Sequence, residues 1–186
     1  MHPQTYILKN HQVSSLTYAD TFRYGVEISL GLKNVDVQPL NIEIDNALFA
    51  LNSQSKNLPD VAVSQIDSDL VLTCGCSAVK NTLCEHQTLV LQTLISKPDL
   101  KVFFEKNIRL EKIKKAAEAY GMADEEDLEK YFGLKYADRQ TYVVPLNNEL
   151  IPVDEKSTSF LKNKLFAKHI GSFETEKNET IEQILV

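Results

Sequence analysis

All three cysteines of this 186-residue chain lie within eleven consecutive positions, where their side chains can act together. Cys74 and Cys76 are separated by one residue, and Cys84 and His86 repeat that spacing after seven intervening residues. Three thiolates and one imidazole are a known ligand set for a tetrahedral zinc ion. Since four protein ligands leave no position for an activated water, the pattern predicts a structural Zn2+ and no catalytic residues.

The first pair of ligands follows an apolar run at residues 70–72, which predicts a strand. In an extended chain, side chains two positions apart point to the same face, so the Cys74 and Cys76 sulfurs can reach one ion. Gly75 lies between them and is expected to allow a sharp turn or a close approach of the backbone to the metal.

The second pair opens a predicted helix, because apolar residues recur at helical spacing over residues 83–95. Positions two apart on a regular helix do not face each other. Cys84 is therefore expected just before the helix, with His86 in its first turn. The free amide groups and the positive end of the helix dipole would stabilise a thiolate at that position.

Other interpretations of the cysteines compete with structural zinc. Buried thiols can be ordinary small core residues, although four ligand side chains at this spacing favour a metal. A disulfide is disfavoured because the number of cysteines is odd and no segment resembles a signal peptide. We therefore expect a reducing, cytoplasmic location. A catalytic metal site would require one of the four side chains to leave the ion.

The pattern Cys-x-Cys, a short spacer and Cys-x-His resembles the SWIM zinc finger, with Cys74, Cys76, Cys84 and His86 in the ligand positions. Leu83 and the apolar helix after it also fit this family. The family is known from helicase-associated Swi/Snf-type ATPases of bacteria, and the flanking sequence is loosely similar to the N-terminal region of such a DNA-dependent ATPase. The resemblance implies an accessory zinc-finger module that contacts nucleic acid or protein, or positions the ATPase motor of the same polypeptide.

The rest of the sequence offers no set of catalytic residues. None of the six glycines is followed by the lysine and hydroxyl residue of a phosphate-binding loop, and the two-histidine motif of zinc hydrolases is missing. We therefore expect no enzymatic activity from this chain and no small-molecule substrate. No apolar run of about 18 residues occurs, so we expect no membrane span.

The charge balance bears on the kind of partner. The formal net charge is −6, whereas a dedicated DNA-binding domain is usually basic. A purely protein-binding or autoregulatory domain is therefore the alternative to one that contacts nucleic acid. Basic residues along the predicted helix at 100–120 either contact phosphates or, as we favour, are solvated charges paired with glutamates. They are Lys101, Lys106, Arg109, Lys112 and Lys115.

The predicted fold class is α+β: an antiparallel sheet over residues 21–75 with a strand-strand-helix zinc finger, followed by a helical segment and a second hairpin. Strict alternation predicts a strand at 22–30. Asp67 and Asp69 are expected to form a turn rather than a catalytic pair. Further extended segments are expected at 35–37, 42–44, 47–51 (strand or buried turn), 61–66, 70–73, 139–145 and, after a turn at 147–148, 149–153. Helices are expected at 84–95, at 100–120 closed by Gly121, at 124–132 closed by Gly133, at 157–170 and at 181–185.

We divide the chain into four parts on this pattern. N-terminal strands occupy 1–59, and the SWIM-like zinc finger occupies 60–96, the range of the closest resemblance. A helical segment covers 97–133, and a hairpin with C-terminal helices covers 134–186. The apolar pattern is unfinished at the last residue, so we expect a fragment of a longer protein.

Overall fold

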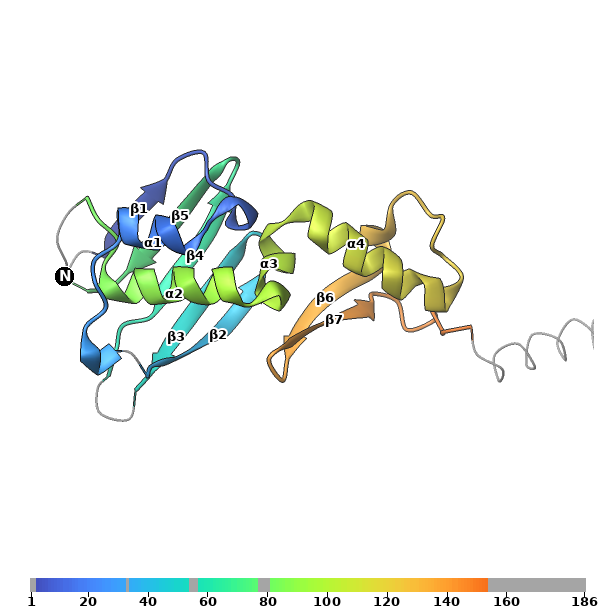
Figure 1. Ribbon diagram of the computed structural model, residues 1–186. Coiled ribbons are helices and arrows are strands. Elements are labelled where there is room, and N and C mark those ends of the chain that lie inside the picture. The colour runs from blue at the N-terminus through green and yellow to red at the C-terminus, as the bar shows by residue number, and fades with distance from the viewer. Residues whose placement is uncertain (1–2, 33, 54–56, 77–80, 154–186) are drawn as a thin grey trace, which may run out of the picture.

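The computed structural model describes residues 3–32, 34–53, 57–76 and 81–153 (Figure 1). It confirms an α+β fold with one five-stranded antiparallel sheet, four helices and a separate two-stranded hairpin. The strands of the sheet are β1 (Gln4–Leu8), β2 (Asp36–Glu43), β3 (Asn46–Asn52), β4 (Val61–Ile66) and β5 (Asp69–Cys74). The helices are α1 (Tyr18–Tyr24), α2 (Glu85–Ser96), α3 (Pro98–Phe104) and α4 (Lys106–Ala117), and the hairpin is β6 (Phe132–Ala137) with β7 (Gln140–Pro145).

The sheet has the order β1-β5-β4-β3-β2, so strands β2 to β5 are joined by successive hairpins and β1 is added beyond β5. Asp45 and Asp67 lie in two of the turns with left-handed φ values of 62° and 52°, a conformation that aspartate tolerates. The predicted strands at 61–66 and 70–73 and the turn between them are confirmed.

Helices α1 and α2 lie across one face of the sheet (Figure 1). The apolar side of α2 is fully buried there, including Val90, Leu91 and Leu94. The chain leaving α1 approaches α2 closely at Gly25, where a Cβ atom would lie 2.5 Å from the Thr88 hydroxyl oxygen. A glycine is therefore required to bring the end of α1 beside the start of α2.

The strand predicted at residues 22–30 is wrong, because this segment contains the end of α1 and an irregular stretch. The Asp20 carboxylate accepts a hydrogen bond from the Thr17 backbone N–H at 2.8 Å, which caps the helix start. Phe22 and Leu30 are 76% and 81% exposed, so the alternation of apolar residues did not reflect a buried strand face. The sheet contains β1 instead of a strand at 22–30, and β1 was not predicted from the sequence.

The two segments expected at 35–37 and 42–44 form one strand, β2, which continues through Pro39. The pairing with β3 shifts between Pro39 and Asn41, as in a β-bulge. An edge strand tolerates such an interruption because only one side of it is paired. Residues 47–51 lie in β3 and are therefore a strand rather than a buried turn.

The helix expected at 100–120 is interrupted at Glu105, which has extended backbone angles between α3 and α4. The Glu105 carboxylate accepts a 2.6 Å hydrogen bond from the Ser14 backbone N–H, which holds the interruption against the N-terminal part of the chain. Gly121 closes the helical segment as expected, with a left-handed φ of 69°.

The C-terminal hairpin uses a different partner strand from the one predicted. Residues 140–145 form β7, but β7 pairs with β6 before it and not with 149–153. The helix expected at 124–132 is reduced to one 3-10 turn at Leu128–Lys130, and Gly133 lies inside β6. The turn expected at Asn147 is present, since its carbonyl accepts from the Leu150 backbone N–H. The helices predicted at 157–170 and 181–185 lie outside the described residues.

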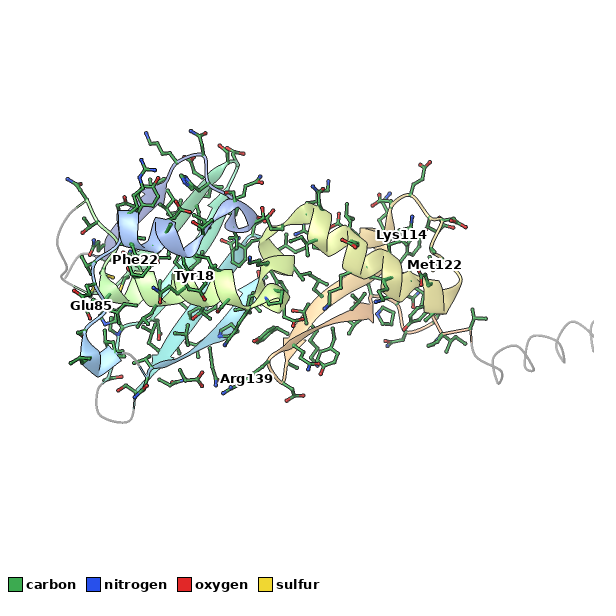
Figure 2. All side chains as sticks on the ribbon, in the orientation of Figure 1. Tyr18, Phe22, Glu85, Lys114, Met122 and Arg139 are labelled. Atoms are coloured by element: carbon green, nitrogen blue, oxygen red, sulfur yellow. The ribbon has the colours of Figure 1, made fainter. Side chains whose placement is uncertain are left out.

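Helix α4 with β6 and β7 forms a C-terminal part, here named the hairpin region. It joins the sheet region, which consists of β1–β5 with α1 and α2, through α3. The Thr141 hydroxyl donates to the Asp99 carbonyl at 2.6 Å. Arg139, at the hairpin turn (Figure 2), forms an ion pair with Asp36 of β2. The four-part division of the chain stays a prediction. Across 3–32, 34–53, 57–76 and 81–153, no helix combines the length and apolar character that crossing a membrane requires.

Candidate metal centre

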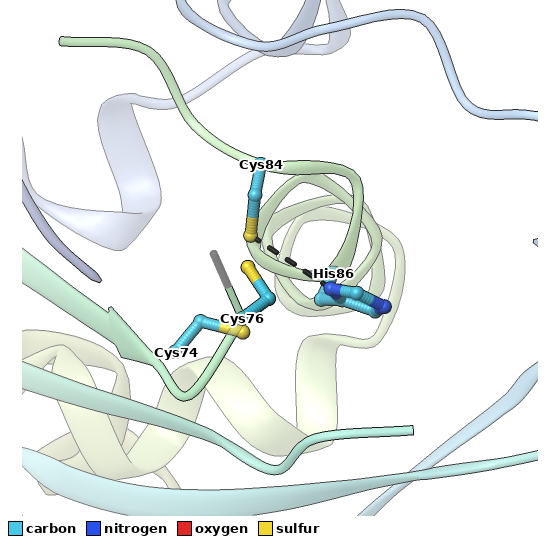
Figure 3. A group of neighbouring side chains, drawn as sticks. All are labelled: Cys74, Cys76, Cys84 and His86. Atoms are coloured by element: carbon cyan, nitrogen blue, oxygen red, sulfur yellow. Dashed lines mark hydrogen bonds between the residues drawn. The ribbon is translucent and has the colours of Figure 1, made fainter. Parts of the chain in front are cut away.

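The four predicted ligands converge between the end of β5 and the start of α2 (Figure 3). Cys74 is the last residue of β5, and Cys76 follows after one residue. Cys84 is the N-cap of α2 and His86 is in its first turn, as predicted. The Sγ atoms of the three cysteines and a ring nitrogen of His86 all lie within 4.8 Å of one another. The group can therefore hold a metal ion such as zinc.

The spacing of the ligand atoms fits a tetrahedral ion with a small contraction. Zinc–sulfur bonds of roughly 2.3 Å place the sulfurs of a tetrahedron about 3.8 Å apart. The distance between the Cys84 Sγ and His86 Nδ1 atoms is 4.0 Å, so these two atoms need only a small approach to bind one ion. Cys74 and Cys84 are 1% and 3% exposed, whereas Cys76 and His86 are partly exposed. The group thus has one side in the core and one side towards solvent.

Strand pairing fixes the β5 side of the group. Cys74 is in register with Gln4 of β1 on one side and with Val61 of β4 on the other. The backbone that carries the first sulfur is therefore held in the interior of the sheet rather than in a free loop.

A capping box fixes the α2 side of the group. The Cys84 sulfur accepts a hydrogen bond from the Gln87 backbone N–H at 3.4 Å, and the Gln87 Oε1 atom accepts from the Cys84 backbone N–H at 3.0 Å. This is the reciprocal pair seen with serine or threonine caps, with a thiol in place of the hydroxyl. A helix amide group therefore points at the Cys84 sulfur, in the arrangement that the predicted stabilisation of a thiolate requires.

The two buried thiols shift each other's pKa in opposite directions. The hydrogen bond from the Cys74 thiol lowers the pKa of Cys84 to about 4, against the effect of burial, and His86 and the Gln87 amide contribute in the same direction. The same hydrogen bond, together with burial, raises the pKa of Cys74. A metal ion bound by both sulfurs must displace any proton that remains on them.

Sequence reasoning missed two glutamines beside the group. Gln87 is fully buried, and Gln4 comes from β1, 83 residues away in sequence. A signal for Gln87 was available, because Cys84 followed three residues later by Gln matches the spacing of a capping box. Gln4 has no such local signal, since its role depends on the pairing of β1 with β5.

Gly75 lies in a bend between the first two ligands, as expected, and it is exposed. The bend does not use a left-handed φ, which among the glycines of the described part of the chain is found at Gly121. A Cβ atom at Gly75 would meet only the Pro59 Cβ atom, at an ordinary 3.8 Å. The turn between the first two ligands therefore has room for a side chain.

The basic residues of the predicted long helix do not form one continuous face. Arg109 is buried and pairs with Glu129 at 2.8 Å, and Lys112 pairs with Asp99 at 3.1 Å. Both residues are therefore paired, but the expectation of solvated charges paired with glutamates along the helix is wrong for them, because Arg109 is buried and both partners lie outside the helix. Asp69 accepts from the Asn10 backbone N–H, in keeping with a structural role.

Comparison of the chain with protein-family models, with curated proteins and with solved structures yields no match. Assignment to the SWIM family therefore stays a prediction that depends on the ligand pattern and its immediate surroundings.

Proposed function

We propose that this chain is a non-catalytic module built around one structural zinc ion, held by Cys74, Cys76, Cys84 and His86. The observation that carries the proposal is the convergence of their four ligand atoms within 4.8 Å. Thiolate and imidazole ligands suit zinc, and four of them close its tetrahedron. The ion supplies cross-linking rather than an activated water, because no coordination position is left for one.

The role of the ion is to fasten α2 to the sheet. Two of its ligands lie at the end of β5 or just after it, and two lie at the start of α2, so one ion ties the strand to the helix. The same helix buries its apolar side against the sheet core. Metal binding therefore stabilises a framework that is also held by packing.

For the biological setting, we propose an accessory region of a Swi/Snf-type DNA-dependent ATPase, on the strength of the resemblance to SWIM zinc fingers. Within that setting, a protein partner is favoured over nucleic acid. The net charge is −6, and two of the five basic residues that might have met phosphates are engaged in ion pairs with Glu129 and Asp99. A phosphate-binding surface usually requires several unpaired cations on one face.

Metal analysis of protein purified without chelators tests the zinc assignment. We expect one zinc ion per chain, and loss of that zinc in Cys84→Ser and in His86→Ala. His11→Ala is the matched control, because His11 is not one of the four residues of the group and instead hydrogen-bonds the Lys9 carbonyl and packs against Tyr24. Zinc-free wild-type protein that also fails to take up added zinc would contradict the proposal.

A salt series separates the two kinds of partner. Binding to DNA through phosphate contacts weakens steeply as the salt concentration rises. We expect no DNA binding, or binding too weak to show such a slope, at about 150 mM salt. A steep dependence with tight binding at low salt would favour nucleic acid instead.

A further inference from the structure

The most completely used polar side chain next to the metal centre is that of Gln87. The residue is 0% exposed, although glutamine is seldom fully buried. Its Oε1 atom accepts from the Cys84 backbone N–H at 3.0 Å. Its Nε2 atom donates to the carbonyl oxygens of Leu72 at 2.9 Å and Gln4 at 3.1 Å. One side chain thus joins the start of α2 to both β5 and β1.

Each of these three hydrogen bonds ends beside a ligand. Cys84 is itself a ligand, and Leu72 lies two residues before Cys74 in β5. Gln4 is in register with Cys74 across the β1–β5 ladder. Gln87 therefore connects the backbone segments that carry the sulfurs, namely the end of β5 and the start of α2. These are the segments that the ion would also link.

The Gln4 side chain continues the same network. Its Nε2 atom donates to the Thr82 carbonyl at 2.8 Å, two residues before Cys84. Its Oε1 atom lies 4.0 Å from the Cys76 sulfur, within reach of a thiol hydrogen bond. Together, the Gln4 and Gln87 side chains contact β5, residues 82–84 before α2, and Cys76. Neither glutamine is one of the four proposed ligands.

We propose that Gln87 is the positioning residue of the metal centre and that Gln4 assists it; this inference rests on the proposed zinc site. Gln87 holds the end of β5 and the start of α2 at ligating distance before the ion arrives. The binding free energy is then not used to bring the two segments together. Groups that orient metal ligands in this way typically change metal affinity by about 10–100-fold when they are removed.

The test is a Co2+ titration of metal-free wild-type protein and Gln87→Met, followed by zinc competition. Methionine is similar in length to glutamine but cannot make the three hydrogen bonds. We expect affinity for both ions to fall by about 10–100-fold and the sulfur-to-cobalt charge-transfer absorbance to weaken as one thiolate moves out of place. A purely structural role in the core would leave that absorbance unchanged at saturating Co2+.

The matched control is Gln92→Met, the same substitution five residues later on α2, where the side chain donates only to the Thr21 hydroxyl at 3.3 Å. We expect wild-type affinity and a wild-type Co2+ spectrum from it. Gln4→Met is the second variant, because Gln4 is only partly buried and lies in the edge strand β1. It should weaken Co2+ binding several-fold.

The outcomes separate this inference from the zinc proposal. If wild-type protein binds Co2+ but folded Gln87→Met binds it with the same affinity and spectrum, Gln87 does not position the ligands. If Gln87→Met does not fold, unchanged binding by Gln4→Met overturns the inference. If the wild type binds neither Co2+ nor Zn2+, the proposed metal site itself fails.

Discussion

The sheet region and the C-terminal hairpin region of this molecule bury very different amounts of apolar surface. Among the residues that the structure describes, the core of the sheet region contains 20 buried residues, which include two cysteines of the candidate metal centre. The core of the hairpin region, counted over the same described residues, contains four: Ile113, Ala117, Leu128 and Phe132. A two-stranded hairpin with so small a core is marginal by itself.

The difference indicates what each region depends on. The sheet region has a core large enough to stay folded without a metal ion. Metal binding should therefore mainly change the local order where the end of β5 meets the start of α2. The hairpin region depends on contacts with α3, notably the hydrogen bonds of Thr141 to Asp99. Perturbing the metal centre and perturbing the hairpin should therefore have effects in different places.

The largest effect is expected from losing a metal ligand. Cys84→Ser should weaken zinc binding by about 4 kcal/mol or more, roughly a thousandfold, since structural zinc binding totals about 10–16 kcal/mol in peptides. Hydrogen exchange should then accelerate first over β4, β5 and α2, and chelation of the wild type should do the same. Exchange in β6 and β7 should not change. Equal acceleration in both regions would contradict the distinction between them.

Truncating one phenylalanine in each core tests the contrast directly. Phe49 is 0% exposed and Phe132 is 2% exposed, so alanine at either position should cost about 3–5 kcal/mol locally. Phe49→Ala should lower the midpoint of the whole denaturant transition. Phe132→Ala should instead unfold the hairpin region separately, as a second, earlier transition by hydrogen exchange. A single shared transition in Phe132→Ala would show that the regions unfold as one unit.

Arg109 lies at the junction of the two regions. Its guanidinium donates to the carbonyl oxygens of Val102 and Phe103 at the end of α3, as well as to Glu129. Arg109→Met should destabilise the hairpin region by about 2 kcal/mol, because hydrogen bonds to charged groups are worth about 1.5–3 kcal/mol. Lys106→Met, at an exposed position of the same helix, is the control and should change little. Urea unfolding monitored separately in each region measures both.

The stability of the metal-free sheet region should rise with pH below the ordinary thiol pKa of 9.0 and fall with pH above it. Folding lowers the pKa of Cys84, so its contribution is complete above pH 9 and is lost as the pH falls towards about 4. Folding raises the pKa of Cys74, so its contribution is complete below pH 9 and is lost above it. The urea midpoint of the metal-free protein should therefore rise from pH 5 to about pH 9. The Cys84→Ser variant should not show this rise.

The smallest effect is expected at Gly75. Since its backbone is not left-handed and a Cβ atom would meet nothing closer than 3.8 Å, Gly75→Ala should change stability and zinc affinity by less than about 0.5 kcal/mol. Gly25→Ala is the contrasting substitution, because its Cβ atom would lie 2.5 Å from two oxygens. A large loss of zinc affinity in Gly75→Ala would mean that the turn between the first ligands must change on metal binding.

The parts of the structure that the sequence predicted are those encoded locally. The ligand spacing placed Cys84 at the helix start and Cys74 at a strand end, because each position depends only on neighbouring residues. The interruption at Glu105 could not be predicted, since its partner Ser14 is 91 residues away. The pairing of β1 with β5 is equally non-local. The alternation at 22–30 does not produce a strand, because Thr17 and Asp20 form a capping box that starts α1 in this segment.

The interruption of β2 at Pro39 has a consequence for how this chain behaves among other copies of itself. The strand lies at the border of the sheet, where another polypeptide would otherwise find a regular row of amide and carbonyl groups. Proline supplies no amide hydrogen, and the shifted register after it makes the row uneven. Self-templated sheet growth is thus discouraged at the β2 edge of the sheet.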